Sequence, residues 1–313
     1  MAAALAQAAF ERHNMTTKTP PSSTRPKGSS SQRSSKLQKY AAYKKMARKG
    51  LRRLKYRIFV PKRRGVRIFG VGAAKTGTHS LGQMFEERVH ARHEVDSEEL
   101  IALHLERETT GKNDKLRAAL KQRDRKRCLK VDASQVNVYL LEDLEALFED
   151  SRYVLTIRSP VLWLRSIVDD SLRRDTTDTW KRFREYRFGQ RTEYPDEEQE
   201  LAERGLFTLA GYLTYWRSAI ERVEKSVPKE RLLVVSTKDL GPRSAEIAEF
   251  CGIPGGGVPT EKAKAFVNTT RFGVLSKIPR DYLEQTIERI CGKKARAYLP
   301  ESSISEEIDK ITS

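Results

Sequence analysis

A glycine-rich segment, GVGAAKTGTHSL, covers residues 70–81 and combines small residues with hydroxyl groups and one lysine. When such a turn opens a helix, its backbone N–H groups and the helix N-terminus point at an anion, which predicts a phosphate-binding loop. A nucleotide P-loop places its lysine after the second glycine, and a Ser or Thr that binds Mg²⁺ follows. Here Lys75 precedes Gly77, so we expect neither a Mg-nucleotide site nor a metal.

A second candidate anion site lies in YVLTIRSPVLWLRS, residues 153–166. A buried strand is predicted to end at Arg158, and Pro160 marks the start of a helix. On such a helix Ser166 faces back toward the strand end, so that Arg158 and Ser166 can bind one phosphate together. Arginine suits this role because its planar guanidinium donates two parallel hydrogen bonds to phosphate oxygens.

Both motifs follow strand-like runs that alternate with helix-length stretches. The runs are VRIFGV (66–71), RCLKV (127–131), RYVLTI (152–157) and RLLVV (231–235). This alternation predicts an α/β fold in three layers, a central parallel sheet covered by helices on both faces. Ligands of such sheets bind at the carboxyl ends of the strands, which is where both motifs stand.

The formal charge of +18 comes almost entirely from the first 65 residues, which carry 18 of the 60 Lys and Arg and one of the 42 acidic residues. Because residues 66–313 are close to neutral, the whole protein is not a basic nucleic-acid binder. Residues 16–36 are rich in Ser, Thr and Pro and predicted to be disordered, whereas residues 36–58 have the spacing of a basic amphipathic helix. We therefore predict a basic, largely disordered leader, 1–65, and one α/β domain, 66–313.

The helix of the leader is interpreted first as packing one stripe on the domain; a peripheral contact of residues 36–65 with an anionic membrane, a nucleic acid and an organelle transit peptide are the alternatives. No segment approaches the ~18–20 apolar residues that cross a bilayer, so we expect no integral membrane segment. Three cysteines without CxxC spacing fit a reducing compartment. We expect a cytoplasmic protein, with organelle targeting by the leader left open.

Taken together, the two motifs resemble those of the sulfotransferase superfamily, which has a PK[ST]GTT-type loop and a similarly spaced Arg and Ser. This chain departs from the loop by Ala74 for the usual Pro and by His79 for the second Thr. The resemblance covers roughly residues 66–290. Softer similarities are GYLTYWRSAI (211–220), LLVVSTKDL (232–240), AEIAEFCGIP (245–254) and VNTTR (267–271).

The resemblance implies a P-loop-like fold and transfer of a sulfuryl group from 3′-phosphoadenosine 5′-phosphosulfate by in-line displacement. Lys75 would stabilise the departing oxygen, and Arg158 with Ser166 would bind the 3′-phosphate. Tyr212 and Arg271 would contact the nucleotide. The 5′-phosphate would be held by Thr76, Gly77, Thr78, His79 and Ser80.

A hydroxyl acceptor also needs a general base. The resemblance favours Glu94, which follows the first predicted helix, as the catalytic carboxylate. His93 beside it and Asp132, at the end of the run RCLKVD, are the alternatives. The acceptor itself, a hydroxyl or an amine on a small molecule, carbohydrate, lipid or peptide, is not indicated.

Two other functions remain as alternatives. A P-loop kinase or NTPase is favoured by Asp132 as a Walker B-like carboxylate and opposed by the positions of Lys75 and Arg158. A non-catalytic scaffold would bind membrane or nucleic acid through the leader, and would not need Lys75.

Overall fold

The computed structural model describes residues 65–173, 175–189, 191, 193–258 and 270–312. The predicted leader, with its amphipathic helix at 36–58 and its membrane contact, lies outside these residues and stays a prediction. Within the described ranges, no helix combines the length and the apolar character that crossing a bilayer requires.

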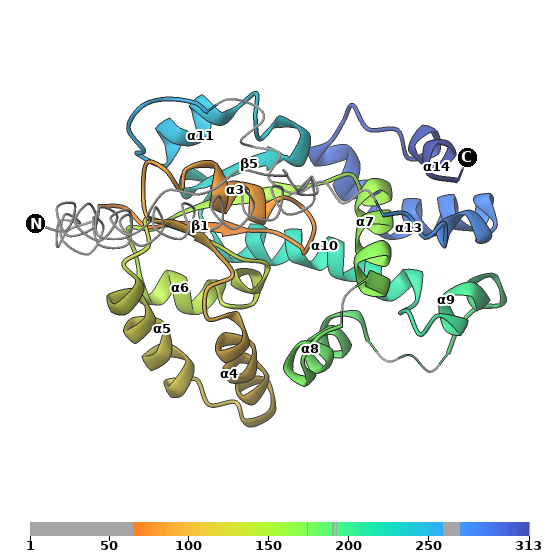
Figure 1. Cartoon of the computed structure of the whole chain (residues 1–313), viewed down its shortest axis with the longest axis horizontal. Coiled ribbons are helices and arrows are strands. Elements are labelled where there is room, and N and C mark those ends of the chain that lie inside the picture. Colours follow the sequence, from red (N-terminus) through yellow and green to blue (C-terminus); the bar gives the residue numbers. More distant parts are fainter. Residues whose placement is uncertain (1–64, 174, 190, 192, 259–269, 313) are drawn as a thin grey trace, which may run out of the picture. The chain divides into compact units, whose positions relative to one another are not determined.

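A single five-stranded sheet forms the centre of the described domain (Figure 1). Its order is β2-β3-β1-β4-β5, and every pair of neighbours is parallel. The central strand β1 lies between β3 and β4, with Ile68 opposite Val131 on one side and Arg152 on the other. The strands are β1 (Ile68–Val71), β2 (Ala91–His93), β3 (Val131–Ala133), β4 (Arg152–Ile157) and β5 (Leu232–Ser236).

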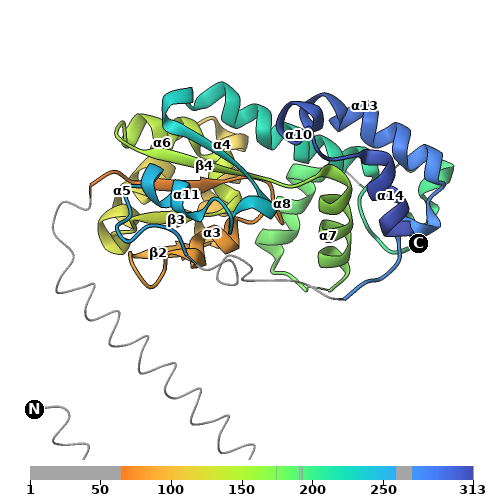
Figure 2. The same ribbon diagram turned by 90° about the horizontal axis from the view of Figure 1, so that it is seen from above.

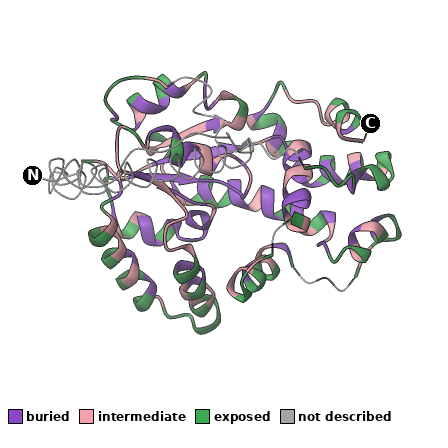
Figure 3. Ribbon diagram, in the orientation of Figure 1, coloured by how far each residue is buried: buried purple, intermediate pink, exposed green. Residues whose placement is uncertain are grey.

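Helices cover both faces of the sheet, and the buried residues fall into two groups, one on each face (Figures 1–3). Helices α3 (Thr78–Met84) and α11 (Ser244–Phe250) pack on one face, where Ile68, Val131 and Val154 point. The opposite, larger group contains Phe69, Tyr153 and Leu155. Its helices are α4 (Ser97–Thr110), α5 (Asp114–Arg127), α6 (Leu141–Leu147), α7 (Pro160–Arg173), α8 (Asp178–Phe188) and α10 (Leu209–Ser226). The later helices α13 (Arg280–Tyr298) and α14 (Ile304–Thr312) belong to the same group, and α9 (Gln199–Glu203) is a short helix before α10. The predicted three-layer α/β fold is confirmed.

The strands at the edge beyond β1 differ from the sequence prediction. The predicted strand at 127–131 is wrong over most of its length, because Arg127 is the last residue of α5 and β3 begins only at Val131. The last turn of α5 holds three basic residues, Arg125, Lys126 and Arg127, and positive charge stabilises a helix C-terminus. The edge strand β2 was not predicted, since three residues are too short for an alternating pattern.

Candidate active site

The glycine-rich loop joins β1 to α3 and needs its two glycines for backbone geometry. Gly72 has φ +146°, and a Cβ atom there would lie 2.6 Å from the carbonyl oxygen of Thr156 on β4. Gly77, with φ +110°, forms the N-cap of α3. Between them Lys75 adopts φ +67°, a left-handed conformation that L residues seldom take. The loop therefore turns tightly and directs the N-terminus of α3 into the space above the strand ends.

Two buried side chains from neighbouring helices fix this loop at Ala74. The backbone N–H of Ala74 donates to the hydroxyl of Tyr215 on α10 over 2.7 Å. The indole N–H of Trp163 on α7 donates to the carbonyl oxygen of Ala74 over 2.6 Å. Because a proline has no N–H to donate, the alanine at this position allows the bond to Tyr215.

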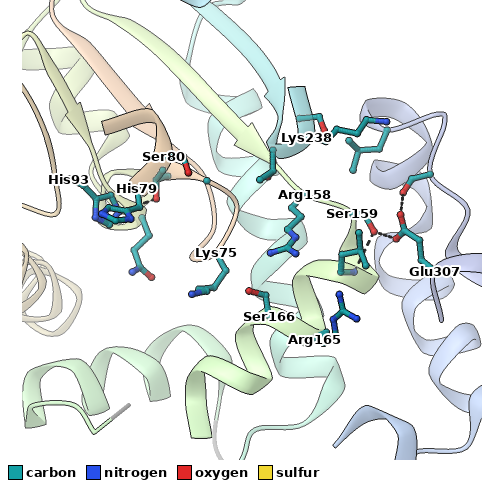
Figure 4. Close-up of a pocket in the computed structure, with 18 of the residues that line it drawn as sticks. Lys75, His79, Ser80, His93, Arg158, Ser159, Arg165, Ser166, Lys238 and Glu307 are labelled. Atoms are coloured by element: carbon teal, nitrogen blue, oxygen red, sulfur yellow. Dashed lines mark hydrogen bonds between the residues drawn. The ribbon is translucent and has the colours of Figure 1, made fainter. Parts of the chain in front are cut away.

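A cavity of about 610 Å³ opens beside the loop at the carboxyl ends of the strands, a volume ordinary for a small-molecule site (Figure 4). It brings together nine of the residues predicted from the two motifs and the resemblance. They are Lys75, Gly77, Thr78, His79, Ser80, Glu94, Arg158, Ser166 and Arg271.

Lys75 extends from the loop toward helix α7, where Figure 4 shows it near Ser166. Its ammonium group lies 3.2 Å from a carboxylate oxygen of Asp170. The same oxygen accepts a hydrogen bond from Arg173 over 2.7 Å. The carboxylate of Asp170 thus joins the loop lysine to α7, and both groups are largely shielded from solvent.

Three arginines, Arg158, Arg165 and Arg271, line one part of the cavity. Burial, together with repulsion from Arg165 and Arg271, lowers the pKa of Arg158 to about 10. The pKa of Arg165 is lowered by burial and by Arg271. The positive charges of the three guanidinium groups repel one another, and this repulsion is relieved when an anion binds between them.

Two histidines, a glutamate and a glutamine line the cavity near β2, where Figure 4 shows His79 and His93 side by side. The two imidazole centroids are 4.8 Å apart, and His93 Nε2 is 3.2 Å from the Thr78 hydroxyl. The neighbouring carboxylate of Glu94 accepts a hydrogen bond from the amide of Gln135, whose oxygen accepts one from Arg187. Glu94 is therefore held in a defined position beside the loop.

The comparison with protein families agrees with this geometry. The family model described as "Sulfotransferase domain" matches residues 67–266, more than half of the chain. The chain belongs to the sulfotransferase family. The match confirms the family predicted from the two motifs, and the protein is a sulfotransferase. No curated protein sequence matches it.

Several solved sulfotransferase structures resemble it at low identity. A sulfotransferase from Alicyclobacillus acidocaldarius is 13% identical, with 78% of this chain and 98% of that chain covered and a TM-score of 0.44. The sulfotransferase domain of the Synechococcus PCC 7002 olefin synthase is 16% identical, with 79% and 93% covered and a TM-score of 0.36. The sulfotransferase domain from the curacin biosynthetic pathway is 12% identical, with 79% of this chain and 95% of that chain covered and a TM-score of 0.32.

Sequence reasoning missed part of the sulfotransferase cavity, including Arg165 and the residues contributed by the end of the chain. Glu307 on α14 accepts hydrogen bonds from the hydroxyls of Ser159 and Ser302, the latter over 2.6 Å (Figure 4). No motif marks Glu307. Arg165 had a detectable signal, since residues 162, 165, 166 and 169 share one face of the helix that starts at Pro160.

Three candidate residues are not among those that line the sulfotransferase cavity. Thr76 belongs to the loop, but its side chain is buried and its hydroxyl donates to the Ala73 carbonyl over 2.7 Å. Tyr212 is fully buried among Phe188 and other aromatic rings and is not among the cavity residues. Asp132 forms a bidentate ion pair with Arg123 on α5, away from the cavity. Neither Tyr212 nor Asp132 is thus in contact with the cavity.

Proposed function

We propose that this sulfotransferase uses 3′-phosphoadenosine 5′-phosphosulfate as donor and transfers its sulfuryl group to a hydroxyl or amine acceptor. One observation carries the proposal: the cavity is lined both by Lys75 with the N-terminus of α3, which has a partial positive charge, and by the three guanidinium groups of Arg158, Arg165 and Arg271. A nucleotide with a 5′-phosphosulfate and a 3′-phosphate has an anionic group for each.

The proposed roles follow from the placement of the residues. Backbone N–H groups at the start of α3, with the hydroxyls of Thr78 and Ser80, suit the 5′-phosphate because a helix N-terminus attracts anions. Arg158 and Ser166 suit the 3′-phosphate, since a guanidinium binds phosphate through two hydrogen bonds. His79 lies beside His93, which is next to Glu94. We therefore assign His79 a contact with the acceptor as well as with the donor.

The chemical step is a direct displacement at sulfur. The acceptor oxygen or nitrogen forms a bond to sulfur, and the bond from sulfur to the bridging phosphate oxygen breaks with its electron pair staying on the nucleotide. Lys75 stabilises the charge that develops on that oxygen, which is electrostatic catalysis of the kind that dominates phosphoryl transfer. Glu94 takes the proton of the acceptor, because it is the carboxylate that lines the cavity next to the loop.

The candidate acceptors are small molecules, carbohydrates, lipids and peptides. The polar side chains of His93 and Gln135 lie next to Glu94, and His79 lies against His93. This lining suits a polar acceptor group.

The test is a thermal shift of the purified protein with adenosine 3′,5′-bisphosphate, the product nucleotide, against ATP with Mg²⁺. A ligand at 100 times its dissociation constant adds about 2.7 kcal/mol of stability. We expect the bisphosphate to raise the melting midpoint and Arg158→Ala to abolish that shift. Stabilisation by Mg-ATP alone, or no shift with either ligand, would overturn the proposed donor.

A further inference from the structure

Asp169 is a buried carboxylate for which the proposed chemistry has no use. It lies on α7, 3% exposed, four residues after Arg165 and three after Ser166, on the face of the helix that lines the cavity. An ionised carboxylate so far from water is costly to the fold unless it is paired. Its contacts therefore indicate its role.

Both oxygens of Asp169 face the segment that carries Arg271. Oδ1 accepts the backbone N–H of Phe272 over 3.2 Å. Oδ2 lies 3.5 Å from a guanidinium nitrogen of Arg271 and accepts no hydrogen bond within the described part of the chain. One carboxylate thus contacts the backbone of Phe272 and the side chain of Arg271, whose guanidinium also donates to the Thr270 carbonyl over 3.0 Å. These contacts restrain the position of the Arg271 side chain.

The partner of Asp169 is much more exposed than Asp169 itself. The side chain of Arg271 is 45% exposed, against 4% for that of Asp169. A pair of this kind contributes little to stability, because the arginine stays well hydrated and the buried carboxylate bears the desolvation cost. What the pair does achieve is to hold a guanidinium beside Arg158 and Arg165, two cations that repel it.

We propose that Asp169 is a positioning residue that holds Arg271 in the subsite for the 3′-phosphate of the donor. The inference rests on the proposed donor. In this arrangement Asp169 does not touch the nucleotide, and its negative charge offsets the repulsion among the three arginines. Its effect on binding is then transmitted through Arg271 and is confined to ligands that have a 3′-phosphate.

The test compares two ligands that differ by that phosphate, adenosine 3′,5′-bisphosphate and adenosine 5′-monophosphate, by titration calorimetry. We expect Asp169→Asn to weaken the bisphosphate about tenfold and to leave the monophosphate within about twofold, the size of one lost charge-assisted hydrogen bond. Arg271→Gln should have the same effect, and the double variant should lose no more than either single one.

Asp170→Asn is the matched control, because it removes a buried charge from the next position of the same helix and acts on Lys75 instead. Both ligands should change together in this variant, so that their affinity ratio stays that of the wild type. A ratio that falls as much as in Asp169→Asn would show a general charge effect and overturn the inference.

The other outcomes are also decisive. Equal affinity of the wild type for the two ligands would refute the proposed donor site and, with it, the role of Asp169. A wild type that prefers the bisphosphate, with additive losses in the double variant, would keep the donor and overturn the positioning role. If the Asp169→Asn protein does not bind the monophosphate, the Asp169→Ser protein, which keeps an acceptor for the Phe272 N–H, is tested in its place. If neither variant binds the monophosphate, Asp169 serves folding alone and the inference is overturned.

Discussion

The ammonium group of Lys75 and the carboxylate of Asp170 lie 3.2 Å apart, so the lysine of the anion loop already has a negative partner within the protein. A bound 5′-phosphate shares Lys75 with that partner. Removing the carboxylate leaves more positive charge for the ligand.

Asp170→Asn is therefore expected to bind both adenosine 5′-monophosphate and the 3′,5′-bisphosphate more tightly, by about threefold at low ionic strength, since a charge close by in a partly buried site is poorly screened. Lys75→Met should weaken both ligands, and adding Asp170→Asn to it should restore little. Calorimetric titrations of the four proteins measure this coupling. Weaker binding in Asp170→Asn would show that the carboxylate chiefly orients the lysine.

Glu94 is expected to act in transfer and not in donor binding, because Gln135 holds it on the β2 side of the cavity, away from the arginines. Glu94→Gln should slow sulfuryl transfer by about 10²-fold or more, as loss of a general base does, with unchanged affinity for the bisphosphate. Transfer of radiolabelled sulfate from the donor into polar and lipid fractions of a cell extract provides the assay. Glu99→Gln, at an exposed position of α4, is the control. Full activity in Glu94→Gln would move the role of base to His93.

Glu307 places a negative charge near Arg158 and Arg165, where it partly offsets the lowering of their pKa by burial and mutual repulsion, and where it competes with a bound phosphate. Glu307→Gln should bind the bisphosphate about threefold more tightly at low salt, an advantage that disappears near 1 M salt, where charges are screened within a few ångströms. Glu306→Gln removes a charge from the neighbouring position, which faces Lys310, and should have no effect. Loss of binding in Glu307→Gln would mean that the carboxylate contacts the nucleotide directly.

His104 makes folding sensitive to acid. Burial lowers its pKa to about 4, and the charge of Arg107 acts in the same direction. The pKa of His104 is lower in the native state than in the unfolded chain, so between about pH 6.5 and 4 the unfolded chain binds a proton that the native protein does not. The free energy of unfolding therefore decreases as the pH is lowered through that range. The free energy of unfolding should drop by about 2 kcal/mol from pH 7 to pH 5 through this group alone.

Urea unfolding at the two pH values, with His104→Asn as the comparison, measures that drop. Asparagine keeps an acceptor for the Arg107 guanidinium, which lies 2.8 Å from Nδ1 in the native protein. The variant should lose about 2 kcal/mol less than the wild type over the same interval, since only the histidine titrates there. Parallel losses in both proteins would assign the acid sensitivity to carboxylates elsewhere.

Gly72→Ala is expected to destabilise the domain by about 3 kcal/mol or more, because it adds a clash to an unfavourable φ. The new Cβ would lie 2.6 Å from the Thr156 carbonyl oxygen. Gly111→Ala, with φ +68° at the end of α4 and no atom within 4 Å of the added Cβ, should cost only about 1 kcal/mol. Equal costs for the two variants, measured by chemical denaturation, would argue that the close contact at Gly72 relaxes.

Most of the features that depend on a local sequence pattern could be predicted from the sequence. Gly72 and Gly77 predicted the turn, and the apolar run before Arg158 predicted β4 with its bounds. The Arg158 and Ser166 spacing predicted two cavity residues because helix geometry converts spacing directly into position. Tyr212 was placed by similarity of a segment, which gives its helix but not the direction of its ring.

The remainder of the site depends on tertiary packing. Glu307 reaches the cavity only because α14 packs against α7, and neither helix encodes that contact in its own spacing. Asp132 had the residue type and position of a functional carboxylate, yet Arg123 on α5 pairs with it. Pairings between distant segments have no local signature, so they could not be predicted from one sequence.

The central position of β1 also governs how the domain assembles. Both of its neighbours in the sheet, β3 and β4, follow it in the chain only after α3, β2, α4 and α5. During synthesis the apolar strand Ile68–Val71 therefore stays unpaired until the segments that form β3 and β4 have been synthesised. Such non-local pairing slows folding and leaves the growing chain open to aggregation, so slow expression at low temperature should favour soluble protein.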